Sequence, residues 1–414
     1  MARQFLIAAL GAASLSAAWP ASVAHADEEP PSRSDDATST DDAPPKPVPT
    51  PPHVTFLGYV EGFYQYNFNR PSNGLTNYRA FDNRANSFTL ANVAVGAAWE
   101  AGPVVGKLVL QVGHTPSTYY ASSEPTSPGS SGANASSSEL WKYVQEANVG
   151  YKAPVGNGLL LQLGLFLSPI GPESMAIHDQ WNWSRSTLFY ALPYYHAGLR
   201  ATYELTPEWT ASLGVYNGWN DIVDNNEDKS FAATLAYKVA DHVNAQVHYM
   251  SGNERKSGAP EGPYWRHDLD AYAQVDVTPC LSFLAHGNAG FEPNRFGTST
   301  WYAGALYARV KMTEWLYAAV RGDRFWENVA SNSSGTADTM FNWPTGTTWV
   351  TSGTATLDAR PHDNVSIRLE YRRDQADQAL YFRSAVTGDG SAANPFVTNA
   401  RSQDTLTLGA TTWF

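Results

Sequence analysis

The fold of this chain is decided by its last stretch, Asp404-Thr405-Leu406-Thr407-Leu408-Gly409-Ala410-Thr411-Thr412-Trp413-Phe414. Counting back from Phe414, every second residue is apolar or small, and the residues between are mostly threonine and glycine. This period of two predicts a β-strand, and about ten residues is the length that a tilted strand needs to cross a membrane. An open sheet has unpaired backbone groups at its edges and cannot lie in lipid, whereas a closed barrel can. The stretch therefore predicts a transmembrane β-barrel.

The same alternation recurs along the chain. One face of 365–372 carries Val365, Ile367, Leu369 and Tyr371, and the other carries Ser366, Arg368, Glu370 and Arg372. Segments 56–68, 243–250 and 268–277 alternate in the same way. A soluble β-sandwich would also alternate, so this pattern alone leaves both folds open. The predicted secretory leader, the loop pattern described below and the terminal phenylalanine favour the barrel.

The first part of the chain predicts export. Arg3 precedes an apolar run, and Ala24-His25-Ala26 is typical of a signal-peptidase site, so residues 1–26 are expected to be a signal peptide. Residues 27–52 are rich in proline and acidic residues and have no apolar period, which predicts a disordered periplasmic linker. The linker is expected to be a passive spacer, and the alternative is a plug that enters the barrel. The barrel is expected over 53–414.

Composition narrows the function. The 414 residues carry a net charge of −12, which argues against binding to nucleic acid. Aromatic residues make up 13% of the chain and charged residues only 16%, against about 25% in an average soluble domain. The single cysteine, Cys280, is expected to be a free thiol in a small pocket at a tight turn. No closely spaced set of histidines or cysteines predicts a metal site, a cofactor or catalysis.

Turn-forming residues divide the chain into strands. Short turns are expected at 100–103, 154–158, 206–208, 240–242, 278–279, 313–314 and 361–364. Long polar connections are expected at 70–86, 117–138, 168–193, 220–229, 252–265, 291–299, 326–348 and 374–402. Strict alternation of eight long and seven short connections predicts sixteen strands, with short periplasmic turns and long extracellular loops.

Aromatic girdles are expected at both rims, because amphipathic rings prefer the level of the lipid headgroups. Trp209, Trp315 and Trp413 lie beside short turns. Trp219, Trp301 and Trp349 lie near the opposite rim. Placement at both rims favours a membrane protein.

Several segments resemble a known family, the putative beta-barrel porin-2 (OmpL-like) family of bacterial outer-membrane proteins. They are Gly58 to Tyr64, Asn92 to Gly96, Trp181 to Ser186, Phe189 to Arg200 and Val215 to Trp219. The resemblance spans about 53–414 and implies an outer-membrane barrel with porin activity. It also implies that the last strand is read by the barrel-assembly machinery, although Thr412 stands where an aromatic residue is common.

The loop at 168–193 is the strongest functional candidate. It is the third long loop, which in sixteen-stranded general porins folds into the lumen and narrows it. Glu173, His178, Asp179 and Arg185 could present charge to the passage, where close-range electrostatics filter ions. The alternative is that these residues only close the loop on itself.

The inward faces of the strands supply the second candidate site. By alternation, the pore-lining residues are expected to include Glu61, Lys107, Glu146, Arg200, Arg321, Asp323, Arg368, Glu370 and Arg372. Both signs are present, and Arg368 and Arg372 beside Glu370 form a potential basic stripe. Pairing between neighbouring strands is the alternative role for most of them. We expect weak selectivity with a slight cation preference.

The sequence therefore predicts an outer-membrane porin for small hydrophilic solutes or ions, with no cofactor. A loop-plugged structural or adhesive barrel is the alternative, and it would conduct nothing. A homotrimer is possible, but the sequence does not mark an interface.

Overall fold

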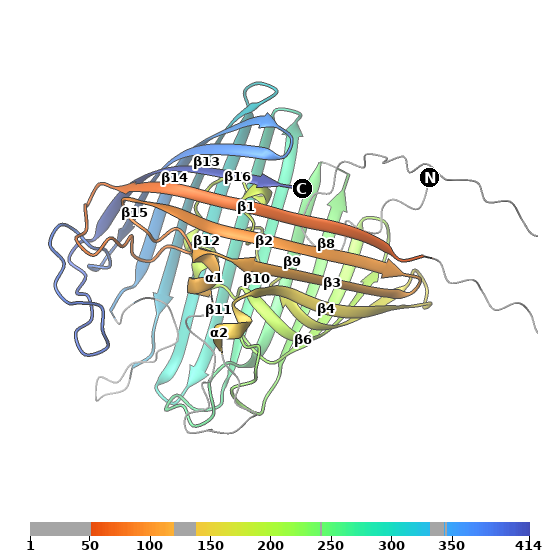
Figure 1. Ribbon diagram of the computed structural model, residues 1–414. Coiled ribbons are helices and arrows are strands. Elements are labelled where there is room, and N and C mark those ends of the chain that lie inside the picture. The colour runs from red at the N-terminus through yellow and green to blue at the C-terminus, as the bar shows by residue number, and fades with distance from the viewer. Residues whose placement is uncertain (1–50, 120–137, 241, 332–342, 344–345) are drawn as a thin grey trace, which may run out of the picture.

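The computed structural model describes residues 51–119, 138–240, 242–331, 343 and 346–414, and in this part of the chain sixteen antiparallel strands form one closed barrel (Figure 1). Each strand pairs with its neighbours in sequence, and the last strand pairs with the first. The strands are β1 (His53–Asn67), β2 (Ser87–Ala101), β3 (Val104–Val112), β4 (Val144–Ala153), β5 (Leu159–Leu167), β6 (Tyr195–Glu204), β7 (Trp209–Tyr216), β8 (Ser230–Val239), β9 (Val243–Asn253), β10 (Trp265–Thr278), β11 (Leu281–Asn294), β12 (Gly297–Lys311), β13 (Leu316–Asn328), β14 (Trp349–His362), β15 (Val365–Ala376) and β16 (Ser402–Trp413).

Helical segments are short and lie between strands. They are α1 (His114–Tyr119), α2 (Ser138–Trp141), the 3₁₀ turn η1 (Ile177–Asp179) and α3 (Thr187–Ala191). Within the described residues, none of these helices has the length and apolar character needed to span a membrane. The predicted signal peptide and nearly all of the predicted linker lie outside the described residues.

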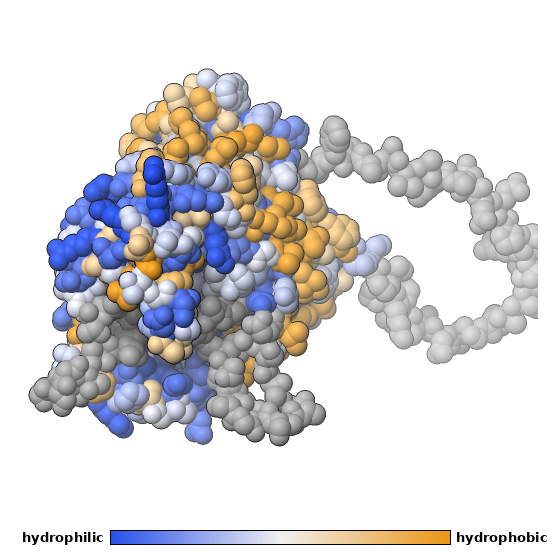
Figure 2. All heavy atoms as spheres, turned by 60° about the vertical axis from the view of Figure 1, so that its left-hand side comes forward, coloured by the Kyte–Doolittle hydropathy of each residue, from blue (hydrophilic) through white to orange (hydrophobic). Residues whose placement is uncertain are grey.

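The barrel is polar inside and apolar outside, as the alternation predicts. On β15, Ser366, Arg368 and Glu370 are buried, whereas Ile367 and Leu369 are exposed. β16 repeats this pattern, with Leu406 and Leu408 exposed on the outer face. In Figure 2, hydrophobic residues gather along the side of the wall and hydrophilic residues gather at the loop end. Such a surface suits a lipid environment around the wall.

The connections follow the prediction with one exception. Cys280 lies in the turn between β10 and β11, as expected, but it is exposed rather than enclosed in a small pocket. The predicted long loop at 291–299 is wrong, because β11 runs to Asn294 and β12 begins at Gly297. The alternation of long and short connections is therefore not strict. Pro293 and Asn294 looked like loop residues, but both pair with β12 in the ladder.

Two of the predicted girdle residues face the lumen instead. Trp301 is buried, and its indole Nε1 donates to Asn288 at 2.7 Å. The Trp413 ring stacks on His178 at a centroid distance of 4.8 Å. By contrast, Trp209 and Trp315 are exposed beside short turns, as expected.

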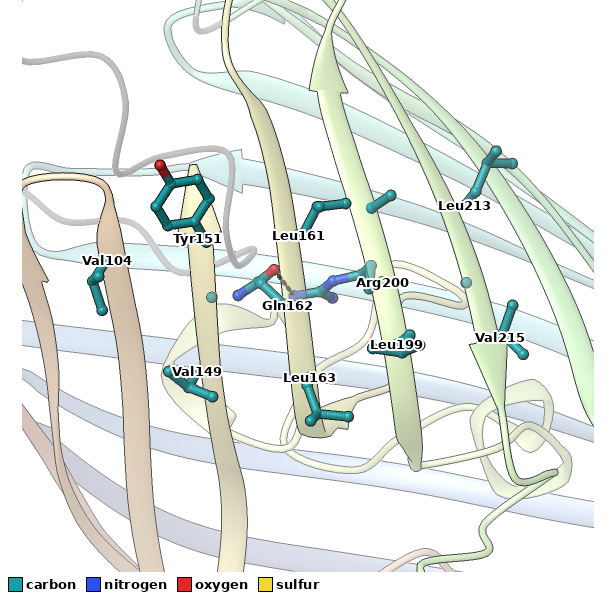
Figure 3. Close-up of a pocket in the computed structure, with 13 residues that line it drawn as sticks. Val104, Val149, Tyr151, Leu161, Gln162, Leu163, Leu199, Arg200, Leu213 and Val215 are labelled. Carbon is teal, nitrogen blue, oxygen red and sulfur yellow. Dashed lines mark hydrogen bonds between the residues drawn. The ribbon is translucent and has the colours of Figure 1, made fainter. Parts of the chain in front are cut away.

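A hollow of about 630 Å³ lies on the outer wall across β3 to β7 (Figure 3). Its sides are aliphatic, and include Leu161, Leu163 and Leu199. Gly150 and Gly214 contribute backbone to its floor. The lining is mainly apolar, which suits the lipid-facing surface, and two of its polar residues, Gln162 and Arg200, hydrogen-bond to each other.

Candidate functional site

One long loop, residues 168–194 between β5 and β6, lies inside the barrel and is called the inner loop here. Its backbone bonds to side chains that point inward from well-separated strands. The Ile177 amide donates to Glu61 on β1 at 2.5 Å. The Gly171 amide donates to Asp270 on β10 at 3.0 Å. Since β1 and β10 are far apart around the closed barrel, the loop crosses the lumen.

Strand β15 holds the middle of the inner loop. The Glu370 carboxylate accepts from the Trp183 amide at 2.6 Å and from the Ser184 amide at 3.0 Å. On either side of Glu370, Arg368 donates to the Asn182 carbonyl at 2.9 Å and Arg372 to the Arg185 carbonyl at 2.5 Å. The carboxylate thus accepts hydrogen bonds from the loop's N–H groups, and the two guanidinium groups donate hydrogen bonds to its carbonyls.

Strand β13 holds the next part of the loop. Arg321 donates from Nη1 to the Ser184 carbonyl at 2.6 Å and pairs with Asp323 at 2.9 Å. Asp323 in turn accepts from the Thr187 amide at 2.9 Å. Arg321 also pairs with Glu173 of the loop at 3.2 Å. Removing one partner from a buried pair of this kind typically costs about 3–5 kcal/mol, because the other charge remains buried.

The seam where β1 meets β16 receives Trp183, a side chain from the middle of the inner loop. Trp183 is 1% exposed and lies beside Phe63 of β1, with ring centroids 6.0 Å apart. On β16, a Cβ at Gly409 would lie 2.3 Å from the Trp183 ring, so this contact requires glycine. The middle of the inner loop is thereby fixed against both closing strands.

The inner loop is also braced internally. Gly171 has a φ of +77°, a conformation that favours glycine at the bend. Ser186 caps α3 by accepting from the Phe189 amide, and its own amide donates to Glu173 at 2.9 Å. Arg185 donates to the Met175 carbonyl. These bonds make the loop a folded unit rather than a flexible strap.

The four predicted constriction residues all belong to this loop, but they do not share one environment. Glu173 and Arg185 brace the loop, as the alternative interpretation had it. His178 and Asp179 lie at η1, where both side chains keep some exposure, at 14% and 10%. Burial lowers the pKa of His178 to about 4 and raises the pKa of Asp179 to about 7. His178 is therefore neutral at pH 7, and its 3.3 Å contact with Asp179 is not an ion pair.

The nine predicted pore-lining residues all point inward and divide into two groups. The clamp side, formed by β13, β14, β15, β16 and β1, carries the members that hold the inner loop. They are Glu61, Arg321, Asp323, Arg368, Glu370 and Arg372. All six are almost fully buried, so the expected basic stripe of Arg368 and Arg372 is covered by the loop.

The open side, formed by β3 to β9, carries the other three. Lys107 on β3 pairs with Glu146 on β4, and the two side chains keep 27% and 12% exposure. Arg200 on β6 donates to Gln162 on β5 at 3.0 Å, as the dashed line in Figure 3 marks. The Arg200 guanidinium also lies 4.3 Å from the Phe166 ring centroid. These groups pair along the wall, as the strand-pairing alternative expected, and Lys107 and Arg200 remain partly exposed to the lumen.

The first long loop, between β1 and β2, also contacts β15 and the inner loop, a role that the sequence did not predict. Arg79 pairs with Asp82 of its own loop and with Asp374 of β15, both at 2.8 Å. Tyr78 lies 5.3 Å from Trp343, and Trp343 stacks on Tyr190 of the inner loop at 5.3 Å. Nothing in the sequence distinguishes Arg79 from Arg70 or Arg84, so no local signal could have found it.

Among the described residues, this arrangement brings polar and charged side chains of the loops and the strands together inside the lumen. In the described part of the chain, no three His, Cys, Asp or Glu side chains are grouped so that they could hold a metal ion. What the lumen provides is a polar wall with a folded obstruction across it.

The sequence matches the family described as "Putative beta-barrel porin-2, OmpL-like" over residues 53–414. A search of curated proteins gives no match. Among solved structures, the chain resembles the outer membrane channel DcaP of Acinetobacter baumannii, at 11% identity and a TM-score of 0.52, covering 88% of this chain and 97% of that one.

Two further structures are similar to the same extent. OmpT of Vibrio cholerae, in a form described as a trimer, gives 8% identity and a TM-score of 0.53, covering 88% of this chain and 99% of that chain. An anion-selective porin from Comamonas acidovorans gives 12% identity and a TM-score of 0.52, covering 88% and 100%. At these identities the likeness shows the shared barrel fold.

Proposed function

The chain belongs to the putative beta-barrel porin-2, OmpL-like, family, and we propose that its barrel passes small hydrophilic solutes and ions by diffusion along the open side of the lumen. The protein is a porin of the bacterial outer membrane. The proposal covers the route of the solutes, their weak selection and passage without a chemical step. The inner loop forms one wall of the route and β3 to β9 form the other.

The observation that carries this proposal is the difference in exposure between the two sides. Several inward polar side chains on the open side keep partial exposure although the loop occupies the lumen, whereas the six clamp-side members named above are almost fully buried. The partly exposed side chains include Lys107, Asn148, Arg200, Thr202, Ser212, Thr234 and Asn244. Hydroxyl, amide and charged groups in this mixture suit hydrated solutes without binding any one tightly. Net selectivity should therefore be weak, with the slight cation preference expected from the acidic chain.

One observation favours the second candidate, a plugged barrel without transport. Towards the loop end, the first loop and the inner loop meet at the aromatic contact of Tyr78, Tyr190 and Trp343. The inward side chains near this contact, such as Phe325, are buried. If the loops close the whole cross-section there, nothing passes.

Single-channel recording in planar bilayers separates the two candidates. The porin proposal predicts discrete conductance steps, whereas a plugged barrel gives none. Liposome swelling with graded sugars and amino acids then reports the size limit. A barrel that is correctly folded, yet shows neither steps nor swelling, contradicts the porin proposal. Deleting 27–52 tests whether the linker contributes a plug, since a plug predicts a rise in conductance.

For assembly, we propose a homotrimer in the lipid bilayer, inserted by the barrel-assembly machinery. The support is limited to the trimeric form described for the Vibrio cholerae OmpT structure. Native mass measurement in detergent tests it, and a monomeric mass across detergents would contradict it.

A further inference from the structure

Arg324 on β13 is a charged residue on the lipid-facing surface of the barrel. It lies near Asn328, the last residue of β13, and is therefore close to the loop end of its strand. Its neighbours in the strand alternate as the barrel requires, with Asp323 and Phe325 buried inside. Arg324 therefore points outward, opposite Gly304 on β12 and Thr351 on β14.

Two tryptophans hold the Arg324 side chain. Its guanidinium carbon lies 4.8 Å from the ring centroid of Trp326 and 4.4 Å from that of Trp349. Tyr302 stacks on Trp326 at a ring-centroid distance of 5.1 Å, so a third aromatic ring lies behind one of these two tryptophans. Tryptophan and tyrosine gather at the headgroup level of a bilayer, which places Arg324 at that level.

Arg324 has no acidic partner among the residues that the structure describes. Its Nε is buried and makes no hydrogen bond there. Arg373, which faces outward two strands away, instead pairs with Asp404 at 3.0 Å. A guanidinium at the edge of a lipid bilayer is unfavourable unless an anion or water satisfies its donors. Arg324 thus leaves its N–H groups for a ligand outside the chain.

A patch of glycines lies beside and below this arginine on the same outer face. Gly304 pairs with Gly287 beside Arg324, and Gly322 pairs with Gly353 one step further from the loop end. A Cβ added at Gly322 or Gly353 would meet nothing within 4 Å. The wall is therefore bare backbone here, flanked by exposed side chains such as Leu306 and Val320. An acyl chain can lie against such a depression.

We propose that Arg324 binds the phosphate of a lipid headgroup, with one acyl chain of that lipid over the glycine patch. A planar guanidinium donates two parallel hydrogen bonds to phosphate oxygens, and the tryptophans fix its orientation. The glycine patch distinguishes a lipid from free phosphate, because only a lipid has a chain to place there. This inference needs the barrel in a membrane and does not depend on whether the lumen conducts.

The test is lipid retention by the purified full-length barrel, measured by native mass spectrometry after exchange into mixed phosphatidylglycerol and phosphatidylcholine micelles. Arg324→Gln should lower bound phosphatidylglycerol about tenfold, because it removes a charge-assisted pair. Arg373→Gln is the matched control and should leave retention unchanged. Gly322→Leu fills the depression and should also reduce retention. Inorganic phosphate and glycerol phosphate, which lack acyl chains, should show no binding that depends on Arg324.

Two results would overturn the proposal. If the wild type and Arg324→Gln retain equal amounts of phosphatidylglycerol, Arg324 does not bind the lipid. If free phosphate binds through Arg324 as well as the intact lipid does, the acyl chain does not contribute to binding. Heat-modifiable gel mobility confirms that each variant is a folded barrel before retention is compared, and single-channel conductance should be the same in all of them.

Discussion

The clamp side and the open side of the lumen both carry inward charges, yet these charges have different partners. On the clamp side, Arg368, Glu370 and Arg372 bond to the backbone of the inner loop. On the open side, Lys107 and Glu146 bond to each other and stay partly exposed. An inward charge in a barrel is thus not by itself a filter. Its role depends on whether a loop or water faces it.

The largest effect is expected from removing the obstruction. Replacing residues 172–186 with a short Gly-Ser linker should raise single-channel conductance several-fold, since the loop crosses the lumen. Replacing 388–394 in the last long loop is the matched control, because most of those residues are exposed. Its conductance should equal that of the wild type. Equal conductance in the inner-loop variant, with folded protein confirmed, would mean that the loop does not limit the passage.

A single clamp residue should matter for stability more than a single open-side residue. Glu370→Ala leaves the Trp183 and Ser184 amides without their acceptor, at a cost of about 1–3 kcal/mol each. Glu146→Ala breaks a partly exposed pair and should cost less than about 1 kcal/mol. Urea titration in detergent gives both free energies of unfolding.

Current recordings extend this comparison. The loosened loop in Glu370→Ala should produce noisier open-channel current, and Glu146→Ala should not. If both variants are equally stable and equally quiet, the division into clamp and open sides has no energetic meaning.

A change of charge on the open side should alter the ion selectivity of the passage. Lys107→Glu places a second acid beside Glu146 and should shift permeability toward cations by about two- to fivefold, as expected for roughly 1 kcal/mol in a wet passage. Reversal potentials across a salt gradient measure this shift. Arg373→Gln changes a charge on the lipid-facing surface and serves as the control with no shift. An unchanged reversal potential in Lys107→Glu would place the conducting route elsewhere.

The smallest effect should come from pH. The pKa of Asp179 is raised to about 7 by burial, so its carboxyl gains a proton as the pH falls from 8.5 to 5.5. Cation preference should then decline, by less than about twofold, because one partly exposed charge is lost. The His178 pKa of about 4 keeps that ring neutral over the whole range. Asp179→Asn should abolish the change, and persistence of the full change in this variant would assign it to another group.

The sequence was a good guide to the wall and a poor one to its contacts. Strict alternation on β15 and β16 predicted which residues point inward, because a strand in a closed sheet has only two faces. The identity of the lumen-crossing loop followed from its position in the order of loops. The contacts between this loop and the wall could not be predicted in the same way. Trp183 and Glu370 are 187 positions apart, and no local pattern links them.

Loop boundaries show the same limit. Pro293, Asn294 and Gly297 have the composition of a loop, but the ladder between β11 and β12 continues up to the turn at 295–296. Proline is tolerated near the end of a strand, where one missing donor costs little. Composition predicts where the chain turns back between two strands better than it predicts how long that connection is.

The contact of Trp183 with Gly409 has a consequence for biogenesis. A ribosome makes Trp183 more than two hundred residues before Gly409, and the seam between β1 and β16 exists only when the last strand has arrived. The inner loop can reach its final seat only after that moment. Quenching of Trp183 fluorescence would therefore time the completion of the barrel during insertion, and Gly409→Val would yield a barrel that closes around a loop left unseated.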